Sequence, residues 1–150
     1  MSEQENQLPP VQVNAQYIKD FSFEAPNAPM IFNELGNQAP DISVQVNLNG
    51  QPLQENIFEI ALQLNVEAKL GDKVAFIVEL TYAGVFTIHV PEEHVQPVLL
   101  IECPRLLFPF ARNIIADATR DGGFPPMLLQ PIDFVQLFRQ RMQQESAGNA

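Results

Sequence analysis

The residues best suited to chemistry are two histidines and one cysteine. His89 and His94 are the only histidines of the chain, and Cys103 is its only cysteine. Imidazole and thiolate groups bind metal ions and serve as catalytic bases or nucleophiles. The histidines are five residues apart and do not share a helical face, so only Glu92 or Glu93 could complete a metal site with them. We interpret both as surface histidines beside a helix start, and we expect no metal and no cofactor.

Other catalytic patterns are missing from the sequence. Cys103 precedes a proline, and no histidine stands at a spacing typical of a cysteine nucleophile, so a buried, small apolar side chain is the simpler interpretation. Gly122-Gly123 lacks the lysine and the spacing of a phosphate-binding loop. The adjacent Glu92-Glu93 pair is typical of a solvated surface. We therefore predict a protein that is not an enzyme, while a carboxylate pair assembled from distant segments stays an open alternative.

Charge and composition argue against two classes of partner. The 150 residues include 18 acidic and 8 basic side chains, for a formal net charge of −10. Nucleic acids and anionic membranes attract clustered lysine and arginine, which this sequence lacks. No apolar run approaches the roughly 18 residues that span a bilayer, and the polar first ten residues do not resemble a secretory signal. One cysteine and no signal favour a cytoplasmic protein, and the surplus of negative charge favours basic partners.

The spacing of apolar residues predicts an α+β fold. A period of two runs through residues 11–24, 42–48, 58–70 and 74–88, which predicts four antiparallel strands. Turn residues follow the second strand at Asn49–Pro52, and Gly71-Asp72 predicts a hairpin between the third and fourth strands. Residues 25–40 are too long for a hairpin and predict a crossover between strands that are not neighbours.

After His89 the period changes to steps of three and four residues. Pro91–Ile101 could hold a short helix, and Arg105–Arg120 predicts the main helix, which Gly122-Gly123 would end. Asp133 is a good N-cap for a last helix. We expect these C-terminal helices to cover one face of the four-stranded sheet. The domain organisation is then a disordered segment over 1–10, a single domain over 11–144 and a flexible tail over 145–150.

One face of the predicted sheet is apolar and the other polar. The first strand would place on the core side its odd-numbered residues Val11, Val13, Ala15, Tyr17, Phe21 and Phe23. The same alternation makes four residues of the first and fourth strands point away from the core, namely Asp20, Glu24, Ile77 and Glu79. They predict an acidic patch with an exposed isoleucine. An ordinary solvated strand face is the plainer alternative.

Apolar residues outside the sheet exceed what one helix needs. Ile31, Phe32 and Leu35 lie in the crossover, and the last helix carries Phe134, Leu137, Phe138 and Met142 on one face. Phenylalanine and methionine surfaces suit the recognition of varied apolar partners. The two groups either pack on each other or form a groove or a subunit interface, and composition does not decide between these.

Four segments carry a resemblance to a known family. Tyr17–Pro29 (YIKDFSFEAPNAP), Leu107–Arg112 (LFPFAR), Gly122–Pro126 (GGFPP) and Pro131–Phe134 (PIDF) resemble the SecB protein-export chaperones. The resemblance runs in order from about Val11 to Gln144. It implies a homotetramer built as a dimer of dimers from large antiparallel sheets. It also implies a chaperone that binds unfolded precursor polypeptides without nucleotide and delivers them to the SecA motor ATPase for export.

The resemblance also implies roles for individual residues. SecA would bind Asp20, Glu24, Ile77 and Glu79. Unfolded clients would bind a groove formed by Phe32, Leu35, Ile42, Val44, Phe134, Leu137, Phe138 and Met142. Assembly of the tetramer would involve Val78, Leu80 and Tyr82. Some relatives have a tryptophan in the crossover and a longer acidic tail, whereas residues 33–39 and 146–150 here have neither.

Two other functions remain open on the sequence. A chaperone of the same fold could serve one dedicated antitoxin partner, and genomic neighbourhood would separate that role from general export. A small-ligand-binding protein could use the same apolar groove, but it would need a closed pocket with converging polar groups. The sequence offers few candidates for such groups.

Overall fold

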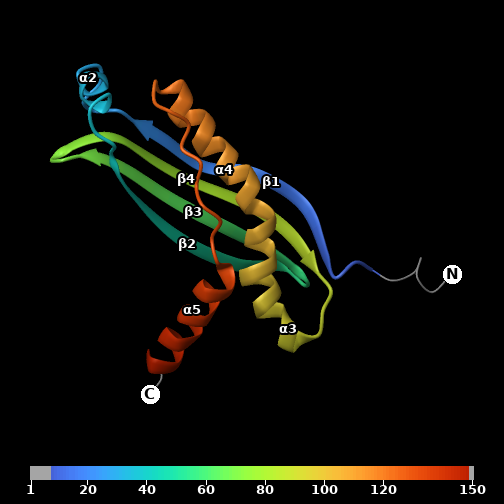
Figure 1. The fold of residues 1–150 in the computed structure, drawn as a ribbon. Coiled ribbons are helices and arrows are strands. Elements are labelled where there is room, and N and C mark those ends of the chain that lie inside the picture. The colour runs from blue at the N-terminus through green and yellow to red at the C-terminus, as the bar shows by residue number, and fades with distance from the viewer. Residues whose placement is uncertain (1–7, 149–150) are drawn as a thin grey trace.

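The computed structural model describes residues 8–148 and contains one antiparallel sheet. Its strands are β1 (Val11–Glu24), β2 (Asp41–Gln54), β3 (Ile57–Leu70) and β4 (Lys73–Ile88), in the order β1-β4-β3-β2. The crossover holds the short helix α2 (Ile31–Leu35). The remaining helices are α3 (Glu92–Pro97), α4 (Cys103–Asp121) and α5 (Phe134–Gly148), and they lie on one side of the sheet (Figure 1). The predicted α+β fold is confirmed.

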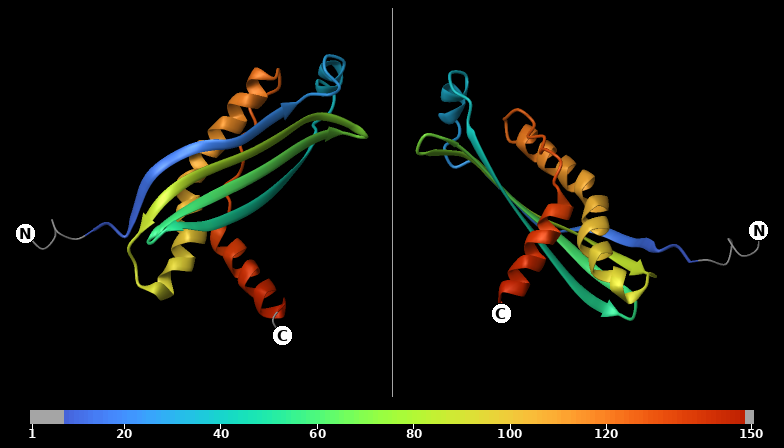
Figure 2. Two further views of the ribbon diagram at one scale, coloured as in Figure 1. Left: turned by 180° about the vertical axis from the view of Figure 1, so that it is seen from behind. Right: turned by 60° about the horizontal axis from the view of Figure 1, so that its bottom comes forward.

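The core lies between β3, β4 and α4. Apolar side chains at every second position of the two central strands are covered on the helix side, among them Ile60, Leu62, Leu64, Val66, Val78, Leu80, Phe86 and Ile88. Leu107, Ala111 and Ile115 of α4 are fully buried against them. The helix comes close at Gly84, where an added Cβ would lie 3.0 Å from Cδ2 of Leu107. The face opposite the helices, which we call the outer face, is seen from the front in the left view of Figure 2.

Two bulges in β1 overturn part of the predicted alternation. The register with β4 shifts between Val13 and Ala15 and again between Ile18 and Asp20. Between the shifts, Ala15 pairs with Val85 and Tyr17 with Ala83, which are outer-face positions. The prediction of core-facing Ala15 and Tyr17 was therefore wrong. Each bulge adds one residue and reverses the facing of the later residues in the strand, so the second one returns Phe21 and Phe23 to the helix side.

The turn between β2 and β3 lies later than predicted. Asn49–Pro52 belongs to β2, and the chain reverses at Glu55-Asn56, where Asn56 has φ 64°. Asparagine tolerates this left-handed conformation. Pro52 is accommodated because β2 is an edge strand, where a missing N–H can face solvent. The predicted hairpin at Gly71-Asp72 is confirmed, with Gly71 at φ 60°.

The helical region after β4 is longer than the predicted main helix. A π-helical turn over Val98–Glu102 joins α3 to α4, which therefore begins at Cys103 rather than Arg105. The N–H of Cys103 donates to the carbonyl of Val98, and Pro104, which has no N–H, follows directly. Gly122-Gly123 ends α4 as predicted, with Gly123 at φ 95°.

The last helix begins where the sequence predicts and continues further. The backbone N–H of Gln136 donates to Oδ1 of Asp133 at 3.0 Å, so Asp133 caps α5. The helix runs past Gln144 to Gly148. The flexibility of 145–150 stays a prediction, and residues 1–7 and 149–150 lie outside the described residues.

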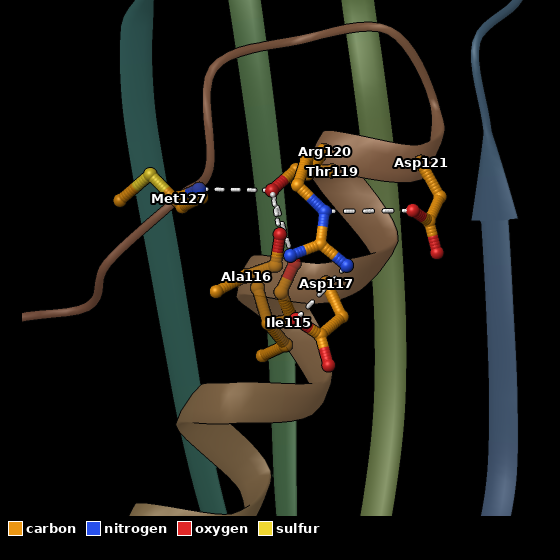
Figure 3. A network of polar contacts seen from close by, with 7 residues as sticks. All are labelled: Ile115, Ala116, Asp117, Thr119, Arg120, Asp121 and Met127. Atoms are coloured by element: carbon orange, nitrogen blue, oxygen red, sulfur yellow. Dashed lines mark hydrogen bonds and ion pairs between the residues drawn. The ribbon is translucent and has the colours of Figure 1, made fainter.

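Thr119 attaches the segment between α4 and α5 to the core. Its hydroxyl, fully buried, is 3.0 Å from the carbonyls of Ile115 and Ala116 and accepts the N–H of Met127 at 2.8 Å (Figure 3). On the solvent side of the same turn, Arg120 pairs with Asp117 and Asp121, each at 3.5 Å (Figure 3). The buried contact fixes where the segment crosses the sheet.

Replacing Thr119 with valine should lower the free energy of unfolding by about 1–3 kcal/mol, because the N–H of Met127 would lose its buried partner while the shape is kept. Urea denaturation measures the change. Thr119→Ser keeps the hydroxyl and should retain more of the stability than Thr119→Val. If the valine variant were as stable as the parent, this hydrogen bond would not hold the segment.

Candidate binding surfaces on the two faces of the sheet

The outer face brings the four predicted docking residues together. β1 and β4 are neighbours, and their register pairs Glu24 with Ile77, Ser22 with Glu79 and Asp20 with Thr81. Residues paired in this way share one face, so Asp20, Glu24, Ile77 and Glu79 form one surface, which we call the acidic patch. The predicted common face is thus confirmed, but Ile77 is half-buried and not exposed as predicted. The binding role of the four residues stays a prediction.

Glu67 also belongs to the acidic patch, and sequence reasoning did not single it out. It pairs with Ile77 from the β3 side, so Ile77 lies between Glu24 and Glu67. The alternation in β3 predicted that Glu67 faces outward, but its partner could not be counted back from the Gly71-Asp72 hairpin, because the register shifts between Ala68 and Lys69. Lys69 lies 3.4 Å from Glu67. Among the described residues no cation pairs with the exposed Glu24 or Glu79, so both carboxylates are available to a basic partner.

A second polar cluster lies on the outer face at Glu59. Lys19 donates to Oε1 of Glu59 at 2.7 Å, and the hydroxyl of Tyr17 donates to Oε2. Glu59 is only 7% exposed. The hydrogen bond from Lys19, and then that from Tyr17, lowers the pKa of Glu59, while burial and the nearby Glu59 raise the pKa of Tyr17 to about 12. The cluster engages Lys19, whose charge is thus directed away from the acidic patch.

The Glu59 cluster predicts a pH-dependent contribution to stability. Because the folded pKa of Glu59 lies below its ordinary value of 4.5, its contribution is complete above that pH and is lost as the pH falls through the folded pKa. Glu59→Gln should therefore differ most from the parent at neutral pH, and the difference should shrink below about pH 4.5. Urea denaturation between pH 7 and pH 3 measures this. A difference that is constant with pH would contradict the assignment.

On the helix side, a groove lies beside the crossover. This crossover groove has a volume of about 310 Å³ and is lined by Leu35, Gln38, Ala39, Pro40, Ile42, Ala75, Phe76, Phe124, Pro125, Pro126 and Met127. None of these residues is charged. Phe124 lies at the centre of an aromatic cluster, with its ring centroid 5.0 Å from those of Phe76 and Phe32. The groove therefore suits an apolar guest.

A second groove lies between the far end of β2 and α5. This α5 groove has a volume of about 420 Å³ and is lined by Val46, Asn47, Leu48, Leu100, Leu137, Phe138, Gln140, Arg141 and Gln144. Nη1 of Arg141 donates to the backbone carbonyl of Leu48 at 3.1 Å, which holds α5 to the strand. Between the two grooves, β2 exposes Val44, whose side chain is 41% exposed.

The predicted client groove is thus two grooves joined by β2. Leu35 and Ile42 line the first, and Leu137 and Phe138 line the second. Three other predicted residues are exposed, namely Phe32, Val44 and Met142. Phe134 is only 2% exposed and packs on Phe108, so it lies beneath the surface and not in a groove wall.

Sequence reasoning missed the groove residues of the connecting segment. Phe124 and Met127 line the crossover groove, but they lie between Gly122-Gly123 and Asp133, where no periodicity predicts their surroundings. Their position is set by contacts with α4. The proline-rich sequence, which keeps the segment extended, was the only available signal.

The residues predicted for assembly are core residues. Val78 and Leu80 are 0% and 1% exposed within one chain, and Tyr82 is 8% exposed. They leave almost no surface for a second chain, so any effect on assembly would act through the packing of α4, and the assembly role stays a prediction. The alternation in β4 buries them under α4. Tyr82 stacks on Phe110 with ring centroids 6.3 Å apart, so it supports a residue that is itself exposed.

A different apolar surface combines β1 with α4. It is formed by Val13, Ile18 and Phe21 on the strand and by Leu106 and Phe110 on the helix, whose side chains are 40–52% exposed. We call it the β1–α4 face. A hollow of about 440 Å³ lies at one end of it, with Phe21, Ile114 and Gly122 among its lining residues. Exposed apolar groups over two adjacent elements are typical of a protein interface.

The residues first considered for chemistry have ordinary surroundings. Cys103 is fully buried, and burial raises the pKa of its thiol to about 12, so the thiol remains protonated at neutral pH. Nε2 of the exposed His94 lies 3.7 Å from Glu93. Within residues 8–148, no three histidine, cysteine or acidic side chains are placed to share a metal ion. No helix in the same range is long and apolar enough to cross a membrane.

Comparisons with known proteins agree with this geometry. The family model described as preprotein translocase subunit SecB matches residues 4–145. The protein-export protein SecB of Paramagnetospirillum magneticum is 58% identical over 140 residues, which cover 93% of this chain and 90% of that protein. The protein of the same name from Rhodospirillum rubrum is 52% identical over 145 residues, covering 94% and 90%.

A solved structure shares the fold. The SecB-like chaperone Rv1957 of Mycobacterium tuberculosis, in complex with a ChAD peptide from the HigA1 antitoxin, superposes with a TM-score of 0.68 at 14% identity, covering 82% of this chain and 91% of that one. This similarity concerns the fold, whereas the family match and the identities above extend over nearly the whole sequence. The chain therefore belongs to the SecB family.

Proposed function

We propose that this chain is a cytoplasmic protein-export chaperone that binds unfolded precursor polypeptides and delivers them to the SecA motor. The observation that carries the proposal is the pair of apolar grooves joined by the exposed side chains of β2. The names of the relatives that are 52–58% identical support an export role for such a surface. The proposed chaperone role requires no catalytic residue.

Client binding is passive in this proposal. Burial of apolar surface contributes roughly 25 cal/mol per Å², so an extended apolar segment gains free energy along both grooves. A folded protein buries such segments in its core, so few of them are accessible to the grooves. A chaperone that binds only the unfolded form opposes folding by mass action.

SecA would bind on the other side of the sheet. The acidic patch lies on the outer face, whereas both grooves lie on the helix side. Glu24 and Glu79 would attract a basic docking segment and orient it, and Ile77 would supply an apolar contact. Client and motor can then bind one chain together, as a transfer between them requires.

We further propose a homotetramer, a dimer of dimers, that uses the β1–α4 face. Its five exposed apolar side chains are the largest such group of the described residues outside the grooves. Covering them would remove a surface prone to aggregation. Several grooves in one assembly would also bind one long client more tightly through effective concentration.

Two rival functions are less well supported. A complex with an antitoxin peptide is what the M. tuberculosis structure describes for its own chain, and at 14% identity that structure bears on the fold alone. A small-molecule carrier needs polar groups that converge in an enclosed pocket. The crossover groove is lined by uncharged and mostly apolar side chains along a strand edge, which suits a chain better than a small molecule.

The proposal is tested by refolding a slow-folding precursor with and without this protein. At one tetramer per precursor we expect the folding rate to fall and the unfolded precursor to elute with the chaperone. The same precursor added after folding is the control and should not associate. An unchanged refolding rate at stoichiometric tetramer would reject the proposal.

A further inference from the structure

The methionines of this chain lie at the surface and not in the core. Three of the four belong to the described residues. Met30 and Met142 are 68% and 42% exposed, and Met127 is half-buried. Within the part of the chain that the structure describes, the buried side chains include no methionine and are mainly leucine, isoleucine, valine, phenylalanine and alanine. The thioether side chains are therefore accessible to small reagents in solution.

Met127 forms part of the wall of the crossover groove. It lines that groove together with Phe76 and Phe124. Its backbone N–H donates to the fully buried hydroxyl of Thr119 at 2.8 Å, which holds the residue at the wall. Of the residues that line the groove, only Gln38 has a side-chain N–H. A polar oxygen added to Met127 would thus find little in the groove with which to form a hydrogen bond.

Met142 lies beside the α5 groove, whereas Met30 belongs to neither groove. Met142 follows Phe138 by one helical turn and comes directly after Arg141, and both of these residues line the α5 groove. Met30 precedes α2 and is the more exposed of the two methionines, but it lines neither groove. Two methionines thus lie at the proposed client surface, and the third can serve as an internal control.

The sulfur of the single cysteine is protected. Cys103 is fully buried, and burial raises the pKa of its thiol to about 12. Since the thiolate is the form that oxidants attack, this thiol reacts slowly at neutral pH. A thioether has no proton to lose, so exposure decides how fast it is oxidised. A soluble oxidant will therefore modify the accessible methionines before it modifies Cys103.

We propose that Met127 and Met142 are sites of reversible oxidation, and that their conversion to sulfoxides by hydrogen peroxide weakens the binding of unfolded clients. In this step the sulfur takes one oxygen atom of the peroxide and loses two electrons, the O–O bond breaks, and the other oxygen leaves as water. A methionine sulfoxide reductase reverses the step, since its thiol pair becomes a disulfide and the oxygen leaves as water. This inference rests on the proposed chaperone function and adds a modification that regulates it.

The sulfoxide weakens binding because it is polar. The oxygen accepts hydrogen bonds from water, and it must give them up when an apolar client covers the groove. Around Met127 only Gln38 could replace them. A sulfoxide at Met30 would stay in water and should have no effect on binding. Leucine has a similar volume and cannot be oxidised, so methionine-to-leucine variants separate the effect of the oxygen from that of the side-chain shape.

Treatment of the full chain with hydrogen peroxide tests the proposal. The parent, Met30→Leu and a double variant, Met127→Leu with Met142→Leu, are each titrated with a labelled, permanently unfolded precursor before and after treatment. Oxidation should weaken binding by the parent and by Met30→Leu about tenfold or more, because two polar groups then face the client. The affinity of the double variant should change by less than about twofold on oxidation. Mass spectrometry of the digested protein locates the added oxygen atoms.

The outcomes separate this inference from the function on which it rests. If the untreated parent did not bind the precursor, the chaperone function itself would fail. If the parent bound it and kept its affinity with sulfoxides at Met127 and Met142, the inference would be overturned and the function would stand. The same holds if both residues stayed unmodified while Met30 was oxidised. An equal loss of affinity in the double variant would place the effect at another group and would also overturn the inference.

Reversal by the reductase provides an independent readout. Methionine sulfoxide reductase with dithiothreitol should remove the oxygen atoms from the oxidised parent and restore its affinity to within about twofold of the untreated value. The sedimentation mass and the urea midpoint of the oxidised parent should stay close to those of the untreated protein, because the modified side chains lie outside the buried core. A lower mass or midpoint, or reduction without recovery of binding, would attribute the loss to assembly or folding and overturn the proposal.

Discussion

Replacing both Ile42 and Val44 with aspartate is expected to weaken the binding of an unfolded precursor about 30-fold or more. These side chains are 39% and 41% exposed, so the folded chain tolerates polar groups there, whereas a bound client would cover them. Each variant carboxylate would lose water without gaining a partner, and a total cost of about 2 kcal/mol corresponds to that factor. Titration of a labelled, permanently unfolded precursor measures the affinity.

The matched control puts the same charges on the other face of the same strand. Ser43→Asp with Gln45→Asp adds two carboxylates to β2, but these positions pair with Glu67 and Asn65 on the outer face. Client affinity should stay within about threefold of the parent, a difference of less than 1 kcal/mol. If both double variants lost affinity equally, net charge or folding would explain the loss, and the row along β2 would not be the client surface.

Replacing Glu24 with lysine should weaken binding to SecA about tenfold or more and leave client binding unchanged. Glu24 pairs with Ile77, and the substitution would turn attraction for a basic docking segment into repulsion beside Ile77 in the acidic patch. Because the groups are exposed, the effect should shrink as salt is added. Surface-immobilised SecA, titrated with the parent and the variant at two ionic strengths, measures both quantities.

Glu55→Lys provides the control for net charge. Glu55 is exposed in the turn between β2 and β3, at the opposite end of the sheet from Ile77. Glu55→Lys changes the net charge of the protein by the same amount as Glu24→Lys, so a general electrostatic effect would weaken the SecA binding of both variants alike. Loss of client binding together with SecA binding in Glu24→Lys would instead indicate damage to the fold.

The parts of this structure that have a regular period were predictable, and the interruptions were not. The alternation in β3 and β4 predicted the core residues, and the Gly71-Asp72 hairpin was correctly placed. The extra residues at the bulges of β1 are the polar Asn14 and Lys19, which suit either face, so nothing in their chemistry predicts a bulge. Tyr17 therefore lies on the outer face and not on the core side, and its hydrogen bond to Glu59 could not be predicted from the sequence.

The candidate surfaces show the same division. Asp20, Glu24, Ile77 and Glu79 could be placed on one face because strand parity decides facing. Parity also predicted that Val78 and Leu80 are covered, but it does not say whether helix α4 or a second subunit covers them. The crossover groove depends on where the segment after Gly122-Gly123 crosses the sheet. That path is held by contacts with α4, among them the hydrogen bonds from Met127 to the buried hydroxyl of Thr119 and from Arg112 to the carbonyl of Leu129.

The layout of β4 makes the length of this strand as important as its composition. Phe76 contributes to the crossover groove and the next residue, Ile77, to the acidic patch. A register shift between Ala68 and Lys69 already accommodates one extra residue before Phe76, but from Phe76 onward the pairing is regular, and deleting one residue there would turn every later side chain of the strand to the opposite side of the sheet. The apolar and the acidic side chains would then lie on the opposite faces of the sheet. Natural variants of this protein should therefore gain or lose residues in this part of β4 only in pairs.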